Sequence, residues 1–368
     1  MSSPALIALS IFVFTGTVEL LVWLLTVAES RLVAKSGCKL VINDSGEEAL
    51  TVPAGRSVLS TLSAEGIFVP SACGGKGTCG ACKCQVHEGG GDVLATELPH
   101  FTKTELREHY RLACQVKVKQ DMRIQVPEEI FSIRRFECTV RSNHNVATVI
   151  KELILELPAG ESMDFRAGGY VQIDIPPYEV DYTQFSIETE SRPDWDKYNL
   201  WQIHASNQET IFRAYSMANH PAEGSVVMLN VRIASPPPRQ SDVPPGIATS
   251  YIFNLKPGDK VSISGPYGEF FAKDTDREML YIGGGAGMAP MRSHLFHLFH
   301  TLRTGREVSF WYGARSRREM FYDDDFKAIQ DEFPNFRYTV ALSEPLPEDN
   351  WDGPVGFIHQ VVHDHYLA

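Results

Sequence analysis

The sequence lacks an excess of basic residues. Its 34 lysines and arginines stand against 46 aspartates and glutamates, and the formal net charge is −12. Proteins that bind nucleic acid present a basic surface to the phosphates, so this charge balance argues against a nucleic-acid partner. Apolar residues are plentiful, at 43 % of 368 residues. A chain of this length and composition can therefore form two or three domains, each with its own core.

Cysteine is scarce. Seven cysteines in a chain of 368 residues are too few, and odd in number, for the disulfide framework of a small secreted domain. The sequence also lacks the second Cys-x2-Cys pair that a structural zinc site would normally use. Three of the cysteines nevertheless fall within residues 71–82, among four glycines, and a fourth follows after 31 residues. Glycines gather in this way where a backbone wraps closely around a bound group.

The spacing of these four cysteines predicts an iron–sulfur cluster. It runs Cys-x5-Cys-x2-Cys and then a distant cysteine, which is the plant-type [2Fe–2S] pattern with one extra residue in the first gap. We therefore predict that the cluster ligands are Cys73, Cys79, Cys82 and Cys114. The remaining Cys38, Cys84 and Cys138 are then unpaired thiols, which indicates a reducing compartment and a cytoplasmic location for most of the chain.

Residues 5–28 are almost wholly apolar, and no basic residue precedes them. A helix of this length would reach about 36 Å, enough to cross a bilayer. The absence of a basic n-region and of a small-x-small cleavage site argues against a signal peptide, so we predict a retained anchor within residues 1–30. Arg31, Lys35 and Lys39 follow it and place its C-terminal side in the cytoplasm. Glu19 either faces a partner helix in protonated form or lies near an interface.

Residues 36–130 predict a small β-rich domain. Apolar alternation and turn residues indicate a hairpin, two further strands and two short helices, and the pattern resembles the β-grasp ferredoxin domain. The hairpin is expected at 39–43 and 49–52, the strands at 83–87 and 113–117, the helices at 57–64 and 102–109, and a linker at 127–135.

Residues 131–273 carry many short apolar runs interrupted by glycine and proline, which is typical of an antiparallel barrel. Within them Arg213, Tyr215 and Ser216 lie close together on one expected strand, followed by Asn219. The guanidinium can pair with a flavin pyrophosphate, the phenol ring can pack on the isoalloxazine, and the serine hydroxyl can hydrogen-bond flavin N5. We therefore predict a flavin site, with Tyr215 and Ser216 nearest the chemistry.

Three other segments of this region have separate interpretations. Gly246, Thr249 and Ser250 lie where a loop is expected to open a helix, and they suit an anion such as the rest of the pyrophosphate. Residues 264–268 are expected to close the barrel with a turn, and residues 176–212 are expected to be an insertion.

Residues 274–368 predict a nucleotide-binding domain. A short buried strand at 279–282 precedes a glycine-rich segment that lacks the third glycine of the usual dinucleotide fingerprint and has proline there. The segment still lets a pyrophosphate approach the backbone, and the proline is expected to start a helix; its predicted site residues are Gly283, Gly285, Gly287 and Pro290. After the next strand, at 308–312, Arg315 and Arg318 either bind nucleotide phosphates or belong to a solvated loop.

Taken together, the motifs RAYSMAN (213–219), GGGAGMAP (283–290) and WYGARS (311–316), behind an anchor and a ferredoxin module, identify a resemblance. The chain resembles the F subunits of the sodium-translocating NADH:quinone oxidoreductases. The resemblance implies NADH as donor, non-covalent FAD, one [2Fe–2S] cluster, and partner subunits in a bacterial inner-membrane pump that delivers electrons to quinone. It also implies a single-pass protein whose other domains face the cytoplasm.

In that family the chain normally continues into a strand ending in Cys-Gly-Pro-Pro, a helix and an aromatic tail, and the sequence stops before them at Ala368. We therefore expect an incomplete nucleotide domain that weakens hydride transfer more than flavin binding. The expected fold is a transmembrane helix, an α+β ferredoxin domain, an antiparallel FAD barrel and an α/β NAD domain of ferredoxin-reductase type. The alternatives are the reductase component of a multicomponent oxygenase and a tethered electron carrier with impaired NADH oxidation.

Overall fold

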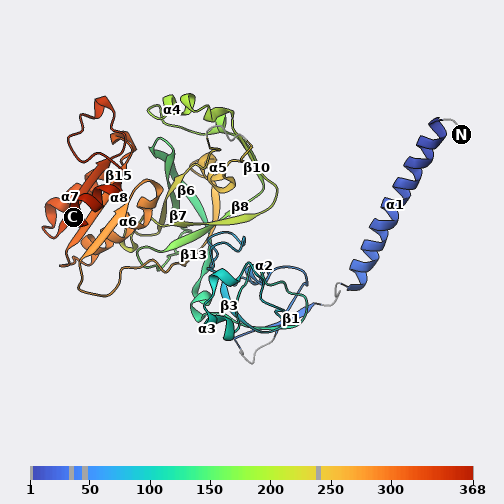
Figure 1. Cartoon of the computed structure of the whole chain (residues 1–368). Coiled ribbons are helices and arrows are strands. Elements are labelled where there is room, and N and C mark those ends of the chain that lie inside the picture. Colours follow the sequence, from blue (N-terminus) through green and yellow to red (C-terminus); the bar gives the residue numbers. More distant parts are fainter. Residues whose placement is uncertain (1–2, 33–36, 44–48, 238–241, 368) are drawn as a thin grey trace. The chain divides into compact units, whose positions relative to one another are not determined.

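The computed structural model describes residues 3–32, 37–43, 49–237 and 242–367, and within the first helix it describes the side chains of residues 10–24 (Figure 1). Its internal contacts divide the chain into two compact units, Met1–Ser132 and Ile133–Ala368. The first unit holds a long helix and a small α+β domain, and the second holds a barrel joined to an α/β domain.

The predicted N-terminal helix is present as α1, Ser3–Leu32. Large apolar side chains such as Phe12, Phe14 and Trp23 are 78 %, 72 % and 60 % exposed along it, and Glu19 is exposed as well. Among the residues whose placement the structure describes, no helix has both the length and the apolar character that spanning a bilayer requires. Lys35, which supports the predicted orientation, lies outside the described residues.

A five-stranded mixed sheet forms the α+β domain, in the order β2-β1-β5-β3-β4. Its hairpin is confirmed, since β1 and β2 pair antiparallel, and β1 also pairs parallel with the distant β5. The first predicted helix is confirmed as α2, Val58–Ala64. Ser57 caps it, since its side chain accepts the N–H of Ser60. The elements are β1 Cys38–Ile42, β2 Leu50–Val52, α2 Val58–Ala64, β3 Lys83–Glu88, α3 Lys103–Arg107, β4 Tyr110–Leu112 and β5 Met122–Gln125.

The predicted strand at 113–117 is wrong, because the strand ends at Leu112 and the chain turns there. The N–H groups of Gln115 and Val116 both donate to the Leu112 carbonyl, at 2.8 and 3.2 Å. Alternation of apolar and polar residues continued past the strand, but Cys114 lies in this turn rather than in a ladder. In a turn, the direction of the Cys114 side chain is not restricted to one of the two faces of the sheet, as it would be in a strand.

The barrel of the second unit has six antiparallel strands in the order β11-β8-β13-β6-β7-β12. A bridge between Met217 and Leu229 links the two ends of that order. Residues 264–267 do not form the expected closing turn, because they lie inside β13, where its register with β8 shifts. The strands are β6 Arg134–Ala147, β7 Ile150–Glu156, β8 Tyr170–Ile175, β11 Ile211–Ser216, β12 Val226–Arg232 and β13 Lys260–Tyr267.

The predicted insertion between β8 and β11 adds aromatic side chains to the hydrophobic core of the barrel. Tyr182, Phe185 and Trp195 are buried there against Phe253 of the helix α5, with ring centroids 4.4 to 6.2 Å apart. Burial of aromatic rings of this size fixes the insertion to the barrel. The elements are β9 Tyr178–Asp181, α4 Arg192–Lys197, β10 His204–Asn207 and α5 Ile247–Asn254.

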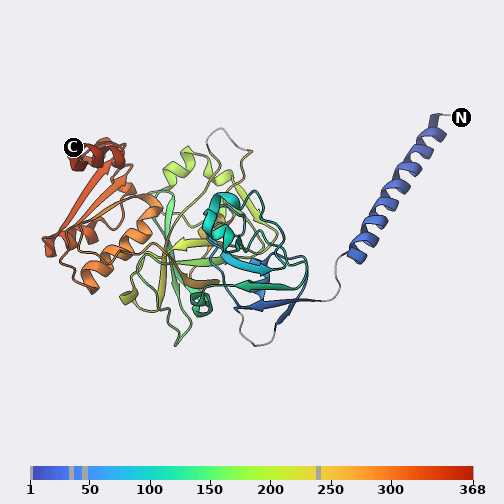
Figure 2. The same cartoon turned by 60° about the horizontal axis from the view of Figure 1, so that its bottom comes forward.

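A parallel three-stranded sheet in the order β14-β15-β16 forms the α/β part, coloured orange to red in Figure 2. The expectation of a buried first strand is half wrong. Tyr281 is 8 % exposed, but Leu280 and Ile282 are 37 % and 42 % exposed, so only one face of β14 is covered in the described structure. The elements are β14 Met279–Gly283, α6 Met288–Phe296, β15 Val308–Ala314, α7 Asp323–Glu332, β16 Phe336–Leu342 and α8 Ile358–Val362.

Candidate functional site

The loop that carries three of the four predicted cluster ligands depends on its glycines. Gly74, Gly75, Gly77 and Gly80 all have positive φ values, between 65° and 83°. Side chains are strained in that conformation, so glycine is required for the loop to curl as it does. The Ser71 hydroxyl accepts the N–H of Gly75 at 3.0 Å and closes the start of the loop.

The four thiols form two pairs. The sulfur atoms of Cys73 and Cys79 lie 3.4 Å apart, and Cys82 and Cys114 lie close enough to shift each other's pKa. In the described part of the chain, no three metal-binding side chains gather at one point. A [2Fe–2S] cluster has two irons, each bound by two of four cysteines, so two pairs of thiols suit it.

The surroundings of two of the four predicted ligands, Cys73 and Cys114, favour the thiolate, the form that binds iron. Burial opposes ionisation of Cys73, but hydrogen bonds from the backbone N–H groups of Thr78 and Cys79 lower its pKa to about 6. The hydrogen bond from Cys82 lowers the pKa of Cys114 to about 7, and the same bond, together with burial, raises the pKa of Cys82. Each predicted pair thus contains one thiol with a lowered pKa, which fits the cluster that the spacing predicts.

The other cysteines lie inside strands and not in the loop. Cys38, Cys84 and Cys138 are 3 %, 1 % and 0 % exposed, in β1, β3 and β6. Burial raises the pKa of both Cys84 and Cys138 to about 12, so these two remain protonated thiols at neutral pH. Their surroundings agree with the predicted division between ligands and non-ligands.

A buried ion pair that the sequence analysis missed supports the turn before Cys114. Arg111 and Glu97 bond through Nη2 and Oε2 at 2.7 Å, with side chains 5 % and 0 % exposed. Glu97 also accepts the N–H of Leu112 at 2.9 Å, and Arg111 donates to the carbonyls of Gly90 and Gly91. The pair thus ties the segment before α3 to the strand that leads to the fourth ligand.

We expect Glu97→Gln to lower the free energy of unfolding of this domain by about 3–5 kcal/mol, since it leaves Arg111 buried without a counter-charge. The measurement is urea unfolding of the whole protein, followed by loss of the cluster's visible absorbance. Glu105→Gln is the matched control, because its partner Lys83 is about one-third exposed and the variant should unfold at the wild-type midpoint. Equal midpoints for the two variants would contradict the assigned role of the buried pair.

The predicted flavin residues lie at the end of one barrel strand. Arg213 and Tyr215 share a face of β11, two residues apart, and Ser216 is the last residue of the strand. The Arg213 guanidinium donates to the carbonyl of Phe212 at 2.7 Å. Tyr215 packs against the barrel core, and burial raises its pKa above the usual value, so its hydroxyl stays protonated.

Asn219 is used inside the protein. Its Nδ2 donates to the Val226 carbonyl at 2.8 Å and its Oδ1 accepts the N–H of Met228 at 2.9 Å. The side chain is fully buried, so it holds the segment after β11 against β12. These contacts give Asn219 a structural role, and its direct contact with the cofactor stays a prediction.

The expected helix after the proline-rich loop is confirmed as α5, with Gly246 as its N-cap. The hydroxyls of Thr249 and Ser250 donate back to the Gly246 carbonyl, at 3.1 and 2.8 Å, and Ser250 also bonds Tyr182. Anion binding at this point would therefore come from the backbone N–H groups of the first turn, which have no partner within a helix. The two hydroxyls stabilise the turn instead.

The glycine-rich segment between β14 and α6 passes directly against the end of β15. A Cβ atom at Gly284 would lie 2.1 Å from the carbonyl oxygen of Gly313, and Gly285 has a φ of +56°. Around Gly287, by contrast, a Cβ would meet nothing within 4 Å. Pro290 does not begin the helix, which starts at Met288, but its first-turn position still needs no N–H partner.

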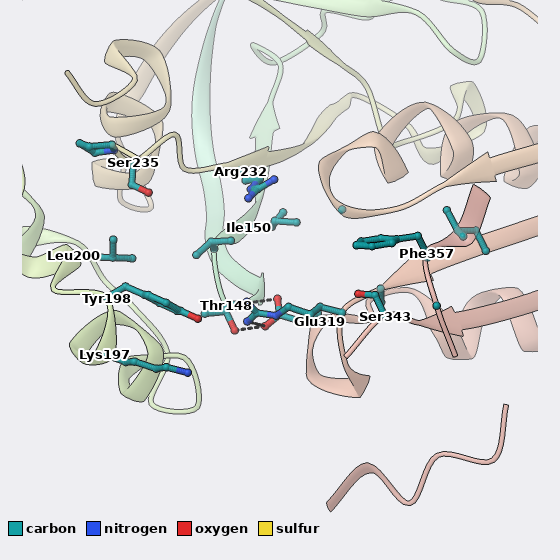
Figure 3. Close-up of a pocket in the computed structure, with 18 residues that line it drawn as sticks. Thr148, Ile150, Lys197, Tyr198, Leu200, Arg232, Ser235, Glu319, Ser343 and Phe357 are labelled. Carbon is teal, nitrogen blue, oxygen red and sulfur yellow. Dashed lines mark hydrogen bonds and ion pairs between the residues drawn. The ribbon is translucent and has the colours of Figure 1, made fainter. Parts of the chain in front are cut away.

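A pocket of about 660 Å³ lies where this segment faces the barrel. Figure 3 shows Lys197 and Tyr198 on one side of it, Ser343 and Phe357 on the other, and Thr148 bonded to Glu319 between them. Ligands of open parallel sheets bind at such a place, beyond the carboxyl ends of the strands. Two of its lining residues, Gly285 and Arg315, are among the predicted site residues. Seven other lining residues come from five separate segments and were not predicted: Thr148, Ile150, Lys197, Tyr198, Arg232, Glu319 and Phe357.

The two arginines after β15 have different surroundings. Arg315 lines the pocket, 39 % exposed, with Glu319 at 3.5 Å. Arg318 bonds Asp194 of α4 at 2.6 Å and so joins the α/β part to the insertion. With Lys197 and Arg232, Arg315 makes the pocket cationic, since Glu319 is its one lining carboxylate among the described residues. A cationic pocket of this size suits a dinucleotide pyrophosphate.

Comparison with known families finds three matches along the chain. A 2Fe-2S iron-sulfur cluster binding domain matches residues 41–119. An oxidoreductase FAD-binding domain matches residues 197–271, and an oxidoreductase NAD-binding domain matches residues 281–368. These matches cover the cysteine loop, the strand with Tyr215 and the glycine-rich segment, and they confirm the predicted cofactors.

Comparison with whole proteins gives the family. The chain is 58 % identical over 361 residues to the F subunit of the Na(+)-translocating NADH-quinone reductase of Neisseria meningitidis, covering 98 % of this chain and 89 % of that protein. This chain belongs to the family of these F subunits. The corresponding F subunit of Pseudomonas aeruginosa is 57 % identical, with coverage of 98 % and 88 %.

A solved structure shares the fold of this F subunit at lower identity. The Amycolatopsis reductase GcoB is 24 % identical, with a TM-score of 0.60 and coverage of 90 % of this chain and 87 % of that one. The likeness shows that the ferredoxin, barrel and α/β parts form one known combination. The family assignment rests on the relatives in Neisseria and Pseudomonas, whose identity to this chain is more than twice as high.

Proposed function

We propose that this chain is the electron-entry subunit of a membrane-bound, Na⁺-translocating NADH:quinone reductase, and that it passes electrons from NADH toward quinone through its partner subunits. The observation that supports this most is the combination, in one chain 58 % identical to a known F subunit, of the four-thiol loop, the flavin strand and the cationic pocket. Bound FAD supplies a group that accepts a hydride and releases electrons singly, as the one-electron cluster requires.

The residues of β11 would hold the flavin. Arg213 pairs with the pyrophosphate, where the first turn of α5 adds backbone N–H groups. Tyr215 covers a face of the isoalloxazine and keeps water away from it, and its buried hydroxyl stays neutral. Ser216, at the end of the strand, donates a hydrogen bond at N5, the atom that receives the hydride.

The nucleotide would lie in the cationic pocket. The backbone of residues 283–287 and the first turn of α6 take its pyrophosphate, and Arg315 pairs with a phosphate oxygen. Because Gly284 lies directly against Gly313, the glycine-rich segment and β15 form one continuous floor for the bound nucleotide. Cys73, Cys79, Cys82 and Cys114 hold the cluster.

An anaerobic titration of the purified chain with NADH tests this function. We expect loss of flavin absorbance, followed by appearance of the electron paramagnetic resonance signal of a reduced [2Fe–2S] cluster. If NADH leaves the flavin oxidised while dithionite reduces both centres, the chain is a tethered carrier and not the entry point. Transfer to an added oxygenase component, with none to quinone-reductase subunits, would favour the oxygenase alternative.

We also propose that α1 anchors the chain in the bacterial inner membrane, with the remaining domains on the cytoplasmic side. The apolar run at 5–28, the exposed Phe12, Phe14 and Trp23, and the basic residues that follow support this. The partner subunits of the pump would then be reached within the membrane plane.

For the anchor, we expect the full chain to stay with membranes in high salt and to enter solution with detergent. A variant that lacks residues 1–32 should appear in the soluble fraction with its flavin and cluster absorbance unchanged. Fractionation followed by absorbance spectra measures both. Release of the intact full chain by salt alone, or a mature N-terminus beyond residue 28, would contradict the anchor.

A further inference from the structure

A buried arginine joins the nucleotide helix to the barrel. Arg292 lies in the first two turns of α6 and is 7 % exposed. Its two terminal nitrogens bond both carboxylate oxygens of Glu223, at 2.8 and 2.7 Å, and one of them also donates to the carbonyl of Ala218 at 2.9 Å. Its guanidinium stacks 4.1 Å from the ring centroid of Phe296, so its position is defined on several sides.

The next residue of the helix makes a second set of contacts. The Ser293 hydroxyl donates to the carbonyl of Asn219 at 2.7 Å and accepts the N–H of Gly168 at 3.3 Å. Two consecutive residues of α6 thus bond two consecutive carbonyls after β11: Arg292 bonds that of Ala218, and Ser293 bonds that of Asn219. Gly168 precedes β8, the strand that pairs with β11, so α6 holds the ends of both strands.

These contacts lie between the two halves of the proposed reaction. Ala218 follows the proposed flavin contact Ser216 by two residues, and Arg292 follows Pro290 of the glycine-rich segment by two residues. A displacement of α6 against this part of the barrel would therefore change the distance between a bound nicotinamide and flavin N5. Hydride transfer is sensitive to such a change, since a misplacement of about 1 Å can slow a reaction roughly a hundredfold.

We propose that Arg292 and Ser293 are positioning residues that set the distance for hydride transfer from NADH to the flavin. This inference rests on the proposed function of the same site. Lysine cannot replace Arg292 in this role, because a single ammonium group does not reproduce two parallel bonds to Glu223 together with one to Ala218. Because these bonds go to backbone carbonyls and to both oxygens of one carboxylate, they fix the orientation of α6 relative to the barrel as well as its distance from it.

The test compares Arg292→Lys and Ser293→Ala with the wild-type chain by stopped-flow reduction of the flavin. We expect the rate at saturating NADH to fall about a hundredfold in Arg292→Lys and by a smaller factor in Ser293→Ala. FAD content and the dissociation constant for NADH should stay close to wild type. The deuterium isotope effect with NADH labelled at the transferred position should rise, which a general loss of stability would not produce.

Arg303→Lys is the matched control. Arg303 also pairs with a carboxylate, Glu332, and lies over an aromatic ring, Phe333, but it is 63 % exposed and both partners belong to the α/β part. In the Arg303→Lys variant, NADH should reduce the flavin at the wild-type rate. Hydrogen exchange of the backbone at 216–219 should quicken in Arg292→Lys and not in Arg303→Lys.

Two outcomes would overturn the inference. The first is an unchanged rate of flavin reduction in Arg292→Lys protein that retains its full FAD content. The second is a rate of flavin reduction that falls, in both Arg292→Lys and Ser293→Ala, only in proportion to the FAD that each variant has lost. If Arg292→Lys does not fold, an unchanged rate in Ser293→Ala overturns the inference by itself. Failure of the wild-type flavin to accept electrons from NADH would instead refute the proposed function, so the two failures can be told apart.

Discussion

Replacing Cys79 by alanine is expected to abolish the [2Fe–2S] cluster while leaving FAD bound. The Cys79 sulfur lies 3.4 Å from that of Cys73, and an iron that loses one of its two thiolates is no longer held. The electron paramagnetic resonance signal of the reduced cluster should disappear from the purified variant, and flavin absorbance should remain. NADH should still reduce the flavin, because its proposed contacts lie on β11 in the other unit.

The same loss is expected for alanine at each of the other three ligands, Cys73, Cys82 and Cys114. Cys84→Ala is the control within the same domain. Its thiol is buried in β3, with a pKa of about 12, so the variant should keep the full signal. Loss of the cluster in Cys84→Ala, or its survival in Cys79→Ala, would show that the ligand assignment is wrong.

A single methyl group at Gly284 is expected to slow reduction of the flavin by NADH at least about a hundredfold. Its Cβ would lie 2.1 Å from the Gly313 carbonyl oxygen, far inside van der Waals contact, so the glycine-rich segment and β15 must separate. Displacement of about 1 Å at a reacting centre has an effect of this size. The effect of the added methyl group is purely steric, because the backbone of Gly284 is extended, with a φ of 173°, which any residue can adopt.

Gly305→Ala is the matched control in the same α/β part, away from the glycine-rich segment and the pocket. Its φ lies outside the left-handed region, and an added Cβ would meet nothing within 4 Å. Stopped-flow absorbance should show wild-type reduction for this variant and slow reduction for Gly284→Ala, with equal FAD content in both. Rapid reduction in Gly284→Ala would mean that the nucleotide does not depend on this contact.

The cluster loop and the flavin strand were predictable because their decisive residues are neighbours along the chain. Three of the four thiols lie within ten residues, and Arg213, Tyr215 and Ser216 lie within four. Their spacing therefore already implies proximity, and the residue types specify the chemistry. The same holds for the cap of α2 by Ser57, which acts over three residues.

The surroundings of a side chain could not be predicted where its partner lies on another element. Asn219 looked free to contact a cofactor, but β12 occupies both ends of its amide. Arg318 looked equivalent to Arg315, but Asp194 of the insertion, distant in sequence, holds it. The alternation after Leu112 looked like a strand, but hydrogen bonds to the Leu112 carbonyl turn the chain toward the cluster loop.

By itself, then, the sequence determined which cofactors the chain binds, since short-range spacing encodes the predicted thiol set, the predicted flavin contacts and the glycine-rich segment. Only the tertiary structure decided which distant residues contact those sites and hold them in place within each unit. The Arg292–Glu223 bond joins residues 69 positions apart, and the bond from Thr148 to Glu319 spans 171. Such contacts carry no local pattern, because they depend on how distant elements pack and on which polar groups that packing leaves to be paired.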